Sequence, residues 1–547
     1  MEYEDLIKIK PVLDYDVDEK DSQIALIIRE NKPEVYIYGE NKVNTFGFPE
    51  EVVWADSDRL LITIDPEGGE RRGIYEWEKG WEKPKPLLVD KYDNFSPMVT
   101  SHGILFISNR DGKTLHLYLY DGNNIENISK GEEPVGRYCT NGELIVYSQG
   151  IYDDNIYVSD FGGNTIKELS FNESEQIVPS ENCFLNKDKF IFLSNHNDTF
   201  GLYSYDMKKD EISSIINVSD YDIQEAVVYN EEKILYTLIK DGKSELLQVP
   251  NIRLEKGGYI HDLKVVKNSV YYLMSKHSRA TDLYVIEGKL SQRLTDSMNG
   301  VKDEFVSPSS ITYDSDGIKI HALLYSRGNE DKGVVYIHGG PDFQCVDNFN
   351  PEIQFLVKKG FKVICPDYRG STGYGRKFNH LNDKDLGGGD LHDVINAVKV
   401  LKVKKVAVTG ASYGGYLTMM AVTKYPDLWC SAVAVVPFVN WFTEKQFERE
   451  VLKQYDEIKI GNDEALLRDR SPIFFVDRIR APLMLLAGQN DPRCPAEETI
   501  QVVEELKKLG RQVEYKIYEG EGHGFIKIEN YIDSIKRTVE FIANHCR

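Results

Sequence analysis

Long hydrophobic runs are absent from this chain of 547 residues. The longest apolar stretches, such as SAVAVVPFV at 431–439, are far shorter than the ~20 residues that a transmembrane helix needs. The N-terminal segment, MEYEDLIKIKPVLDYDVDEKD, is acidic and lacks the apolar core of a signal peptide. From these absences we expect no membrane contact and a cytoplasmic location.

Cysteine is scarce, and its seven positions show no pairing rhythm and no Cys-x-x-Cys motif. An odd number of unevenly spaced cysteines favours buried free thiols in a reducing compartment over disulfides. No group of His and Cys has the spacing of a zinc site, so we expect neither a metal nor another cofactor. Low-complexity segments are also absent, and the 41% hydrophobic and 28% charged residues are typical of a globular protein.

An excess of positive charge is missing too, because the formal net charge at pH 7 is −22. The charge is uneven, since residues 311–547 hold 33 acidic and 32 basic side chains, whereas residues 1–310 hold 55 and 34. Such a step predicts two different domains that meet near residue 310, and it argues against nucleic-acid binding by the acidic one. The simplest interpretation of the acidity is a solvated, soluble surface.

Helical periodicity is nearly absent before residue 310, where short strand-like runs repeat instead. An apolar residue followed by tyrosine, two further residues and a polar or turn residue recurs six times, and a seventh copy has leucine in place of the tyrosine. The repeat positions are Tyr36, Tyr75, Tyr118, Tyr157, Tyr203, Leu247 and Tyr284, at spacings of 37 to 46 residues. A period near forty is typical of four-stranded propeller blades, which bury their faces only when they stack in a ring. The repeat predicts a seven-bladed β-propeller, with about twenty-five residues before its first strand and without the Trp-Asp signature of scaffold propellers.

After residue 310, apolar strands alternate with amphipathic helices. This pattern indicates a mainly parallel sheet that is covered on both faces and binds ligands at the carboxyl ends of its strands. We expect strands within 332–340, 361–370, 404–410, 430–438, 482–491 and 512–520, and helices within 390–401, 414–426, 497–510 and 531–546. The predicted domains are 1–307, whose short N-terminal segment is a candidate for packing on its neighbour, and 308–547.

One serine lies between glycines at the junction of a predicted strand and a predicted helix, in VAVTGASYGGYLTMM. Gly410-x-Ser412-x-Gly414 in this position is a nucleophile elbow, which indicates an α/β-hydrolase domain. The turn forces the serine into a strained backbone geometry, so flanking glycines are needed to avoid clashes. The Ser412 side chain is then expected above the sheet, beside a helix N-terminus that favours negative charge.

A serine hydroxyl needs a general base and a carboxylate that orients the base. In hydrolases of this type the order is Ser, Asp, His, which predicts Asp491 at the end of PLMLLAGQND and His523 in GEGHGF. Both lie at the strand edge that carries Ser412. Among the rival groups, His380 and His392 precede the serine, and His545 lies at the end of the last predicted helix. Asp477 comes before its strand, at the wrong edge of the sheet.

The attacked carbonyl develops an oxyanion that needs hydrogen-bond donors already in place. The backbone N–H of Tyr413 is one, and we expect the second from Gly339 and Gly340 in IHGGP. A plain tight turn is the alternative for these two glycines. The glycine-rich stretches RGSTGYG and LGGGD lack the strand–loop–helix context of a phosphate cradle.

A β-propeller followed by HGGP, DYRGSTGYG, GASYGGY, NDPRCP and GEGHGF resembles the prolyl oligopeptidase family of serine peptidases, and within it the acylaminoacyl peptidases and related oligopeptidases. The resemblance covers nearly the whole chain, but it is specific only in the catalytic half. It implies that Ser412, Asp491 and His523 form the catalytic triad and that Tyr413 and Gly340 supply the oxyanion donors.

The resemblance also implies that Arg493 binds a backbone carbonyl of the substrate, whereas its spacing alone is equally compatible with an ion-pair partner. Phe438 and Trp441 in PFVNWF are candidates for lining the pocket of the residue before the scissile bond, with core packing as the alternative. No clear glutamate pair holds a free amino terminus as in dipeptidyl peptidases. Glu132 and Glu133 are the nearest candidates, and a solvated turn explains them as well.

Together these features predict a serine peptidase that hydrolyses short peptides through an acyl-enzyme on Ser412, with the propeller restricting substrate size. The first alternative is an esterase that uses the same triad on small acyl esters. The second is a non-catalytic propeller scaffold, which the complete triad argues against. We expect short peptides as partners, no nucleic acid and no membrane, and we leave a homo-oligomer open.

Overall fold

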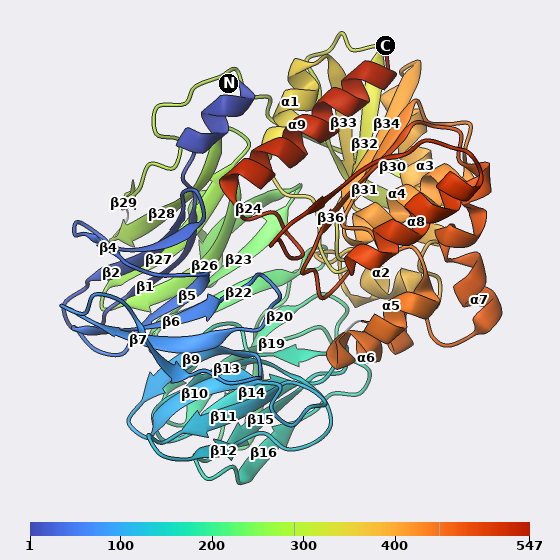
Figure 1. Ribbon diagram of the computed structural model, residues 1–547. Coiled ribbons are helices and arrows are strands. Elements are labelled where there is room, and N and C mark those ends of the chain that lie inside the picture. The colour runs from blue at the N-terminus through green and yellow to red at the C-terminus, as the bar shows by residue number, and fades with distance from the viewer. Residues whose placement is uncertain (289, 448) are drawn as a thin grey trace.

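The computed structural model describes residues 1–288, 290–447 and 449–547. Two bodies lie side by side in Figure 1, a ring of β-sheets from the first part of the chain and a layered domain in which helices flank one sheet. The ring, coloured blue to green, lies below and to the left of the layered domain, coloured yellow to red.

Within the described part of the chain, the strands up to Arg293 form seven antiparallel sheets, each from consecutive strands. Six of these sheets have four strands. The fifth blade along the chain has five, because the short strand β18 also pairs with β19. Blade by blade, the strands are β1 (Val12–Val17), β2 (Ile24–Arg29), β3 (Pro33–Ile37) and β4 (Lys42–Val43); β5 (Phe48–Trp54), β6 (Arg59–Asp65), β7 (Gly73–Glu78) and β8 (Lys85–Leu88); β9 (Asn94–Thr100), β10 (Gly103–Ser108), β11 (His116–Tyr120) and β12 (Ile125–Asn127); β13 (Val135–Thr140), β14 (Ile145–Gln149), β15 (Asn155–Ser159) and β16 (Thr165–Leu169); β17 (Gln176–Ile177), β18 (Phe184–Asn186), β19 (Lys189–Ser194), β20 (Gly201–Asp206) and β21 (Glu211–Ile216); β22 (Ile223–Asn230), β23 (Lys233–Lys240), β24 (Lys243–Gln248) and β25 (Ile252–Lys256); and β26 (Tyr259–Val266), β27 (Ser269–Lys276), β28 (Arg279–Glu287) and β29 (Leu290–Arg293).

Every copy of the tyrosine repeat falls on the third strand, in chain order, of its blade's four-stranded path. Tyr118 on β11, for example, packs in a cluster with Leu61 and Ile74 of the preceding blade, so the repeat position fills space between neighbouring sheets. The period near forty is therefore one blade, and the prediction of seven blades is confirmed. The expected start of the ring is wrong, because β1 begins at Val12, where alternating aspartates hide the strand pattern.

Carboxylates on the first strands of the blades reach across to the next blade. They accept hydrogen bonds from the backbone N–H groups of the neighbouring first strand, from Val52 to Asp14 (2.8 Å), from Ser96 to Glu51 (2.8 Å) and from Leu263 to Glu225 (3.1 Å). The Lys264 ammonium joins the last blade to the first through the Asp16 carboxylate at 2.9 Å. Part of the acidity of this domain thus connects the blades, which a purely solvated surface does not explain.

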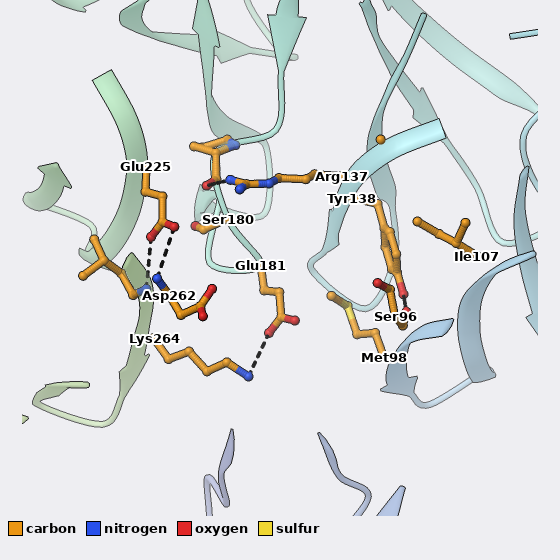
Figure 2. A pocket seen from close by; sticks show the side chains of 13 residues that line it. Ser96, Met98, Ile107, Arg137, Tyr138, Ser180, Glu181, Glu225, Asp262 and Lys264 are labelled. Carbon is orange, nitrogen blue, oxygen red and sulfur yellow. Dashed lines mark hydrogen bonds and ion pairs between the residues drawn. The ribbon is translucent and has the colours of Figure 1, made fainter. Parts of the chain in front are cut away.

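A cavity of about 270 Å³ lies among these strands and is lined by side chains from blades 3 to 7. Figure 2 shows Glu181, Glu225 and Asp262 beside two cations, Arg137 and Lys264. Burial raises the pKa of Glu225, although Arg137 and backbone hydrogen bonds oppose the shift. The lining of this cavity therefore holds more carboxylates than cations.

One eight-stranded sheet forms the centre of the second domain, in the order β30-β31-β33-β32-β34-β35-β36-β37. The pairs β30–β31 and β31–β33 are antiparallel, and all the other pairs are parallel. The strands are β30 (Ser309–Ser315), β31 (Ile318–Tyr325), β32 (Lys332–Ile337), β33 (Phe361–Pro366), β34 (Lys405–Ala411), β35 (Ser431–Val435), β36 (Leu483–Gly488) and β37 (Glu514–Tyr518). The helical segments are α1 (Pro351–Lys358), α2 (Arg376–Asn379), η2 (His380–Asn382), α3 (Gly389–Leu401), α4 (Tyr413–Lys424), α5 (Trp441–Phe447), α6 (Glu450–Lys459), α7 (Glu464–Asp469), η3 (Pro472–Arg478), α8 (Ala496–Lys508) and α9 (Ile528–His545).

The six expected strands correspond to β32 to β37, and the four expected helices to α3, α4, α8 and α9. The sequence missed α1 and the short helices α5 to α7, which the alternation of long apolar segments does not reveal. The expected fold class, a seven-bladed β-propeller followed by an α/β-hydrolase domain, is confirmed.

Alternate side chains of the parallel strands enter two hydrophobic clusters, one on each face of the sheet. On β32, Val335 and Ile337 pack with residues of α3, α4 and α8, while Val334 packs with residues of α1 and α9. Burial on both faces explains the nearly continuous apolar runs. None of the helices in the described ranges is both long and apolar enough to cross a membrane.

The N-terminal segment packs on the hydrolase domain as the short helix η1 (Tyr3–Lys8). The Tyr3 hydroxyl donates a hydrogen bond to Glu540 of α9 at 2.9 Å, and its ring lies 4.3 Å from that of Phe355 in α1. The first residues of the propeller domain therefore contact the helices that cover one face of the hydrolase sheet.

Four of the seven cysteines form disulfides, so the prediction of free thiols is wrong for them. Cys139 on β13 pairs with Cys183 beside the next blade, and Cys430 before β35 pairs with Cys546 after α9. The partners are 44 and 116 residues apart, and only the tertiary packing of separate elements brings them together. The other three, Cys345, Cys365 and Cys494, are free and buried.

The propeller contacts the loops that follow the carboxyl ends of the hydrolase strands. After β33, the backbone N–H groups of Gly373 and Gly375 donate to the Asp222 carboxylate of the propeller at 2.9 and 3.2 Å. The stretch RGSTGYG is therefore a docking loop. In the loop after β32, the Asp347 carboxylate accepts a hydrogen bond from the His277 backbone N–H of the ring at 2.8 Å. In the loop after β36, the Asn490 side-chain amide donates to the Glu67 carbonyl oxygen at 2.8 Å. After β37, Gly522 packs against Gly68.

Replacement of Asp222 by alanine should loosen this docking loop. The variant leaves the N–H groups of Gly373 and Gly375 without their charged acceptor, a loss of about 2–4 kcal/mol in local stability. Hydrogen exchange measured by mass spectrometry should become at least tenfold faster (an order-of-magnitude expectation) over residues 372–377. Asp220→Ala, at an exposed neighbouring position, is the control and should leave this exchange unchanged. Unaltered exchange in Asp222→Ala would show that the loop docks by other contacts.

Candidate active site

The backbone of Ser412 has an unusual geometry at the junction of β34 and α4. Its dihedral angles, φ 58° and ψ −123°, lie in a region that residues with a side chain rarely adopt. A Cβ on Gly410 would lie 2.6 Å from the Ile337 carbonyl oxygen of β32, and one on Gly414 would overlap the same carbonyl. Close approach of β32 therefore requires both glycines of the Gly-x-Ser-x-Gly motif.

Three side chains predicted from the sequence lie in one hydrogen-bonded chain. His523 Nε2 is 2.8 Å from Ser412 Oγ, and His523 Nδ1 is 2.8 Å from Asp491 Oδ2 and 3.0 Å from Asp491 Oδ1. Ser412 follows β34, Asp491 follows β36 and His523 follows β37, so all three come from the carboxyl ends of parallel strands. The arrangement is that of a nucleophile, a general base and a group that orients the base.

The Asp491 carboxylate is held in place by its own loop. Its Oδ1 atom accepts hydrogen bonds from the backbone N–H groups of Arg493 (2.8 Å) and Cys494 (2.9 Å). Asp491 is buried, so its charge is directed at His523 rather than at solvent. With Nδ1 donating to Asp491, His523 has Nε2 free to accept a proton from Ser412.

The rival groups named from the sequence lie in other hydrogen-bond partnerships. His380 pairs with Asp383 at 2.5 Å, and His392 pairs with Asp316 at 3.0 Å. The ring of His545 contacts the Phe541 carbonyl within α9, and Asp477 lies in η3, before β36. Among the described residues, only His523 of these histidines has a hydrogen bond to Ser412.

The backbone donors expected for an oxyanion border the serine. Tyr413 is the first residue of α4, and the backbone of Gly339 lies against the elbow, because a Cβ there would be 3.4 Å from Ser412 Cβ. Gly340 has φ 123°, which favours glycine, and a Cβ there would lie 2.6 Å from the Asp342 nitrogen. The loop after β32 thus brings the backbone of Gly339 against the elbow, with Gly340 next to it in the chain.

Buried polar groups that the sequence analysis did not single out hold this loop. His338 Nδ1 is 2.6 Å from the Gly339 carbonyl oxygen, and its Nε2 is 2.9 Å from Ser371 Oγ. His338, Cys345 and Asp367 lie within 4.8 Å of one another, a spacing that a metal site would share. The Asp367 oxygens, however, already accept hydrogen bonds from the Cys345 N–H (2.6 Å) and the Tyr374 hydroxyl (2.5 Å). The donor set is that of a hydrogen-bond network which shapes the loop.

Arg493 reaches from the Asp491 loop to the propeller. Its Nε donates to Glu70 Oε1 at 2.6 Å, and about half of its side chain is exposed. The Glu70 carboxylate, on the loop between β6 and β7, also pairs with Arg449 at 3.1 Å. No motif in the propeller sequence marks Glu70, which the ring alone brings to this site. The guanidinium of Arg493 is therefore oriented beside the triad by the other domain.

Phe438 and Trp441, candidates for a substrate pocket, are buried in an aromatic cluster. The Phe438 ring stacks on Tyr416 at 4.4 Å and lies 4.6 Å from Trp441. This geometry favours the alternative of core packing, although Tyr413 of the same cluster adjoins the serine. Glu132 and Glu133 are exposed in the turn before β13.

Part of the chain that carries this site is similar to known proteins. Residues 347–547 match the model of the prolyl oligopeptidase family. The chain is 33% identical over 217 residues to dipeptidyl peptidase family member 6 of Caenorhabditis elegans. This match covers 37% of this chain and 29% of that protein. It is 30% identical over 319 residues to the uncharacterized peptidase YuxL of Bacillus subtilis (strain 168). This match covers 52% of this chain and 46% of that protein. The matched regions span less than half of the length of both relatives.

The likeness of the fold extends over both domains. The acylaminoacyl peptidase of Pyrococcus horikoshii superposes with a TM-score of 0.75 over 99% of this chain and 97% of that chain, at 20% sequence identity. Such low identity shows a shared fold alone, here a propeller joined to an α/β-hydrolase domain.

Replacement of Arg493 by alanine should separate a role in substrate binding from a structural one. If the guanidinium binds a substrate carbonyl, its loss removes a charge-assisted hydrogen bond of about 1.5–3 kcal/mol. We expect kcat/KM to fall about 10- to 100-fold for peptides with a carbonyl one residue upstream of the cleaved one, and much less for minimal acyl esters.

Arg480→Ala is a matched control, because Arg480 is exposed and pairs with Asp427 far from the triad. Equal losses on peptides and esters in Arg493→Ala would mean that Arg493 only holds Glu70 of the propeller.

Proposed function

We propose that this protein is a serine peptidase that hydrolyses short peptides, as the match of residues 347–547 to the model of the prolyl oligopeptidase family supports. The observation that carries the proposal is the continuous hydrogen-bonded chain from Asp491 through His523 to Ser412. The proposed chemistry uses these side chains with backbone donors, and it needs no metal or other cofactor.

The triad geometry supports acyl transfer in two steps. His523 Nε2 takes the proton of Ser412 as Oγ attacks the substrate carbonyl carbon, and Asp491 stabilises the imidazolium. The carbonyl oxygen becomes an oxyanion that accepts hydrogen bonds from the backbone N–H groups of Tyr413 and Gly340. When the C–N bond breaks, His523 gives its proton to the departing nitrogen. Water then attacks the acyl-enzyme by the same route and releases the acid.

Our finer proposal is an oligopeptidase of the acylaminoacyl-peptidase type. The fold shared with the Pyrococcus horikoshii acylaminoacyl peptidase supports it, as does Arg493 beside the triad. An esterase acting on small acyl esters has the same triad but has no need of an arginine for a peptide carbonyl. A panel of acylated, prolyl and free-amino chromogenic peptides would define the preferred substrate.

The docking of the propeller supports a limit on substrate size. The loops after β32, β33, β36 and β37 contact the ring, so propeller residues surround the edge of the sheet at which Ser412 lies. A substrate bond then reaches Ser412 in an extended, flexible chain that enters through the channel of the ring or through a gap between the domains. Opening of such a gap would contribute to the turnover rate.

The charge of the channel favours cationic peptides. Carboxylates exceed cations around the cavity of Figure 2, and the propeller domain as a whole is strongly acidic. Peptides with Lys or Arg should therefore enter faster than acidic peptides, with an advantage that salt reduces.

The location and assembly of the protein stay predictions. The two disulfides favour an oxidising compartment over the expected cytoplasm. The oligomeric state can be measured by light scattering.

Ser412→Ala should abolish peptide hydrolysis. Removal of a triad nucleophile lowers kcat on the order of 10⁶-fold, and Asp491→Asn should lower it about 10⁴-fold because the imidazole loses its acceptor. The measurement compares a peptide amide with an ester of the same acyl group. Hydrolysis of the ester alone by the unaltered protein would favour the esterase. If Ser412→Ala kept more than roughly a tenth of the activity, the assignment of Ser412 as the nucleophile would be refuted.

The size limit predicts different fates for one sequence in two contexts. A cleavable sequence in a short peptide should be hydrolysed, whereas the same sequence in an exposed loop of a stable folded protein should stay intact. Mass spectrometry of both substrates under identical conditions measures the difference. Comparable cleavage of the two would rule out the enclosed site.

A further inference from the structure

A cavity of about 290 Å³ lies beside the triad on the face of the sheet that α1 and α9 cover. One wall is His523, and part of the floor is Ala411, the residue before the nucleophile. Ala411 ends a central strand of the sheet and is nevertheless exposed. The cavity therefore opens the elbow on the side of the histidine.

The lining combines aromatic rings with one carboxyl group. Tyr336, Phe349, Phe525 and Tyr531 contribute rings, and Glu352 enters from the first turn of α1. With about 30 Å³ per water molecule as a measure, the volume is sufficient for a long amino-acid side chain. Aromatic faces with a carboxylate suit a cation on an apolar stem, through cation–π contact and an ion pair.

Glu352 has no polar partner among the described residues, because no side chain or backbone group in these ranges donates a hydrogen bond to its carboxylate or forms an ion pair with it. The neighbouring Tyr336 hydroxyl instead accepts a hydrogen bond from Asn350 at 3.2 Å. Burial raises the pKa of Glu352 to about 8. Glu352 is half-buried, and a carboxylate in such surroundings is costly without a partner, a cost that a bound cation would offset.

The chemistry of the triad indicates which part of a substrate passes this cavity. His523 must bring Nε2 to the nitrogen that leaves, so the residue carrying that nitrogen lies along the histidine. The cavity has His523 as a wall and Ala411 as a floor, which puts it on this departing side of the scissile bond.

We propose that this cavity binds the side chain of the residue after the scissile bond and that Glu352 selects Lys or Arg there. The proposal rests on the peptidase function proposed above and specifies its substrate class. The apolar stem of Lys or Arg lies along the aromatic rings, and the cationic head pairs with the Glu352 carboxylate.

The test uses internally quenched peptides with a constant acyl part and Lys, Arg, norleucine or Glu after the scissile bond. The unaltered protein should cleave the Lys peptide with a kcat/KM about tenfold or more above that of the norleucine peptide, the effect of one charge-assisted hydrogen bond. Glu352→Gln should reduce this ratio to about one, and Glu352→Asp should give an intermediate ratio. Labelling of Ser412 by a fluorophosphonate reports that each variant is folded.

Three controls separate the cavity from general attraction by an acidic protein. Glu529→Gln removes an exposed carboxylate from the first turn of α9 and should keep the preference for Lys. Peptides with Lys moved to the acyl side, and assays at high salt, measure electrostatic steering.

Three outcomes would overturn the proposal: equal cleavage of the Lys and norleucine peptides, a preference that survives in labelled Glu352→Gln, or the same loss in Glu529→Gln. Failure of the unaltered protein to cleave any peptide would instead refute the peptidase function itself.

Discussion

The strained backbone of Ser412 is the constraint on which the site depends. A positive φ at a serine persists only because β32 presses the Ile337 carbonyl against the glycines on both sides of the turn. The strain puts the hydroxyl above the sheet, within 2.8 Å of His523. The other catalytic groups then need only to follow neighbouring parallel strands, whose carboxyl ends meet at one edge. Packing in the core of the hydrolase domain, and not the active site alone, thus maintains the nucleophile.

The propeller contributes to the site as well as covering it. Its loop between β6 and β7 holds Arg493 through Glu70, and Gly68 of the same loop packs against Gly522 beside His523. On another part of the ring, Asp222 binds the loop that follows β33. The loops that carry Asp491 and His523, and the loop that follows β33, are therefore supported by residues from the other domain. Movement of one domain relative to the other would change the geometry of these loops.

Carboxyl groups in excess of cations occur at two places in the structure. In the ring, carboxylates join neighbouring blades through backbone N–H groups and leave a channel with more anions than cations. Beside the triad, the half-buried carboxyl group of Glu352 lies among aromatic rings with no described polar partner. The first arrangement acts at a distance and is screened by salt, whereas the second acts on one side chain at one position. In the proposed peptidase, both arrangements would favour basic peptides, for different physical reasons.

The sequence by itself determined the features that depend on local pattern. The tyrosine period predicted seven blades, and the alternation of apolar strands and amphipathic helices predicted a parallel sheet. The spacing of Ser412, Asp491 and His523 after their strands predicted three groups that the structure places within hydrogen-bond distance. These features could be predicted because strand period, helix period and turn chemistry are encoded over a few neighbouring residues.

Tertiary structure alone decided the features that join distant parts of the chain. The disulfides link residues 44 and 116 positions apart, and β1 was missed because its aspartates face other blades. Phe438 and Trp441 lie in the core, since their side-chain directions follow from the packing of α4 and α5. Glu70 meets Arg493 across 423 residues, and Glu352 meets His523 across a cavity. No local pattern marks such residues, because an ion pair or a pocket wall depends on position in space and not on neighbours in sequence.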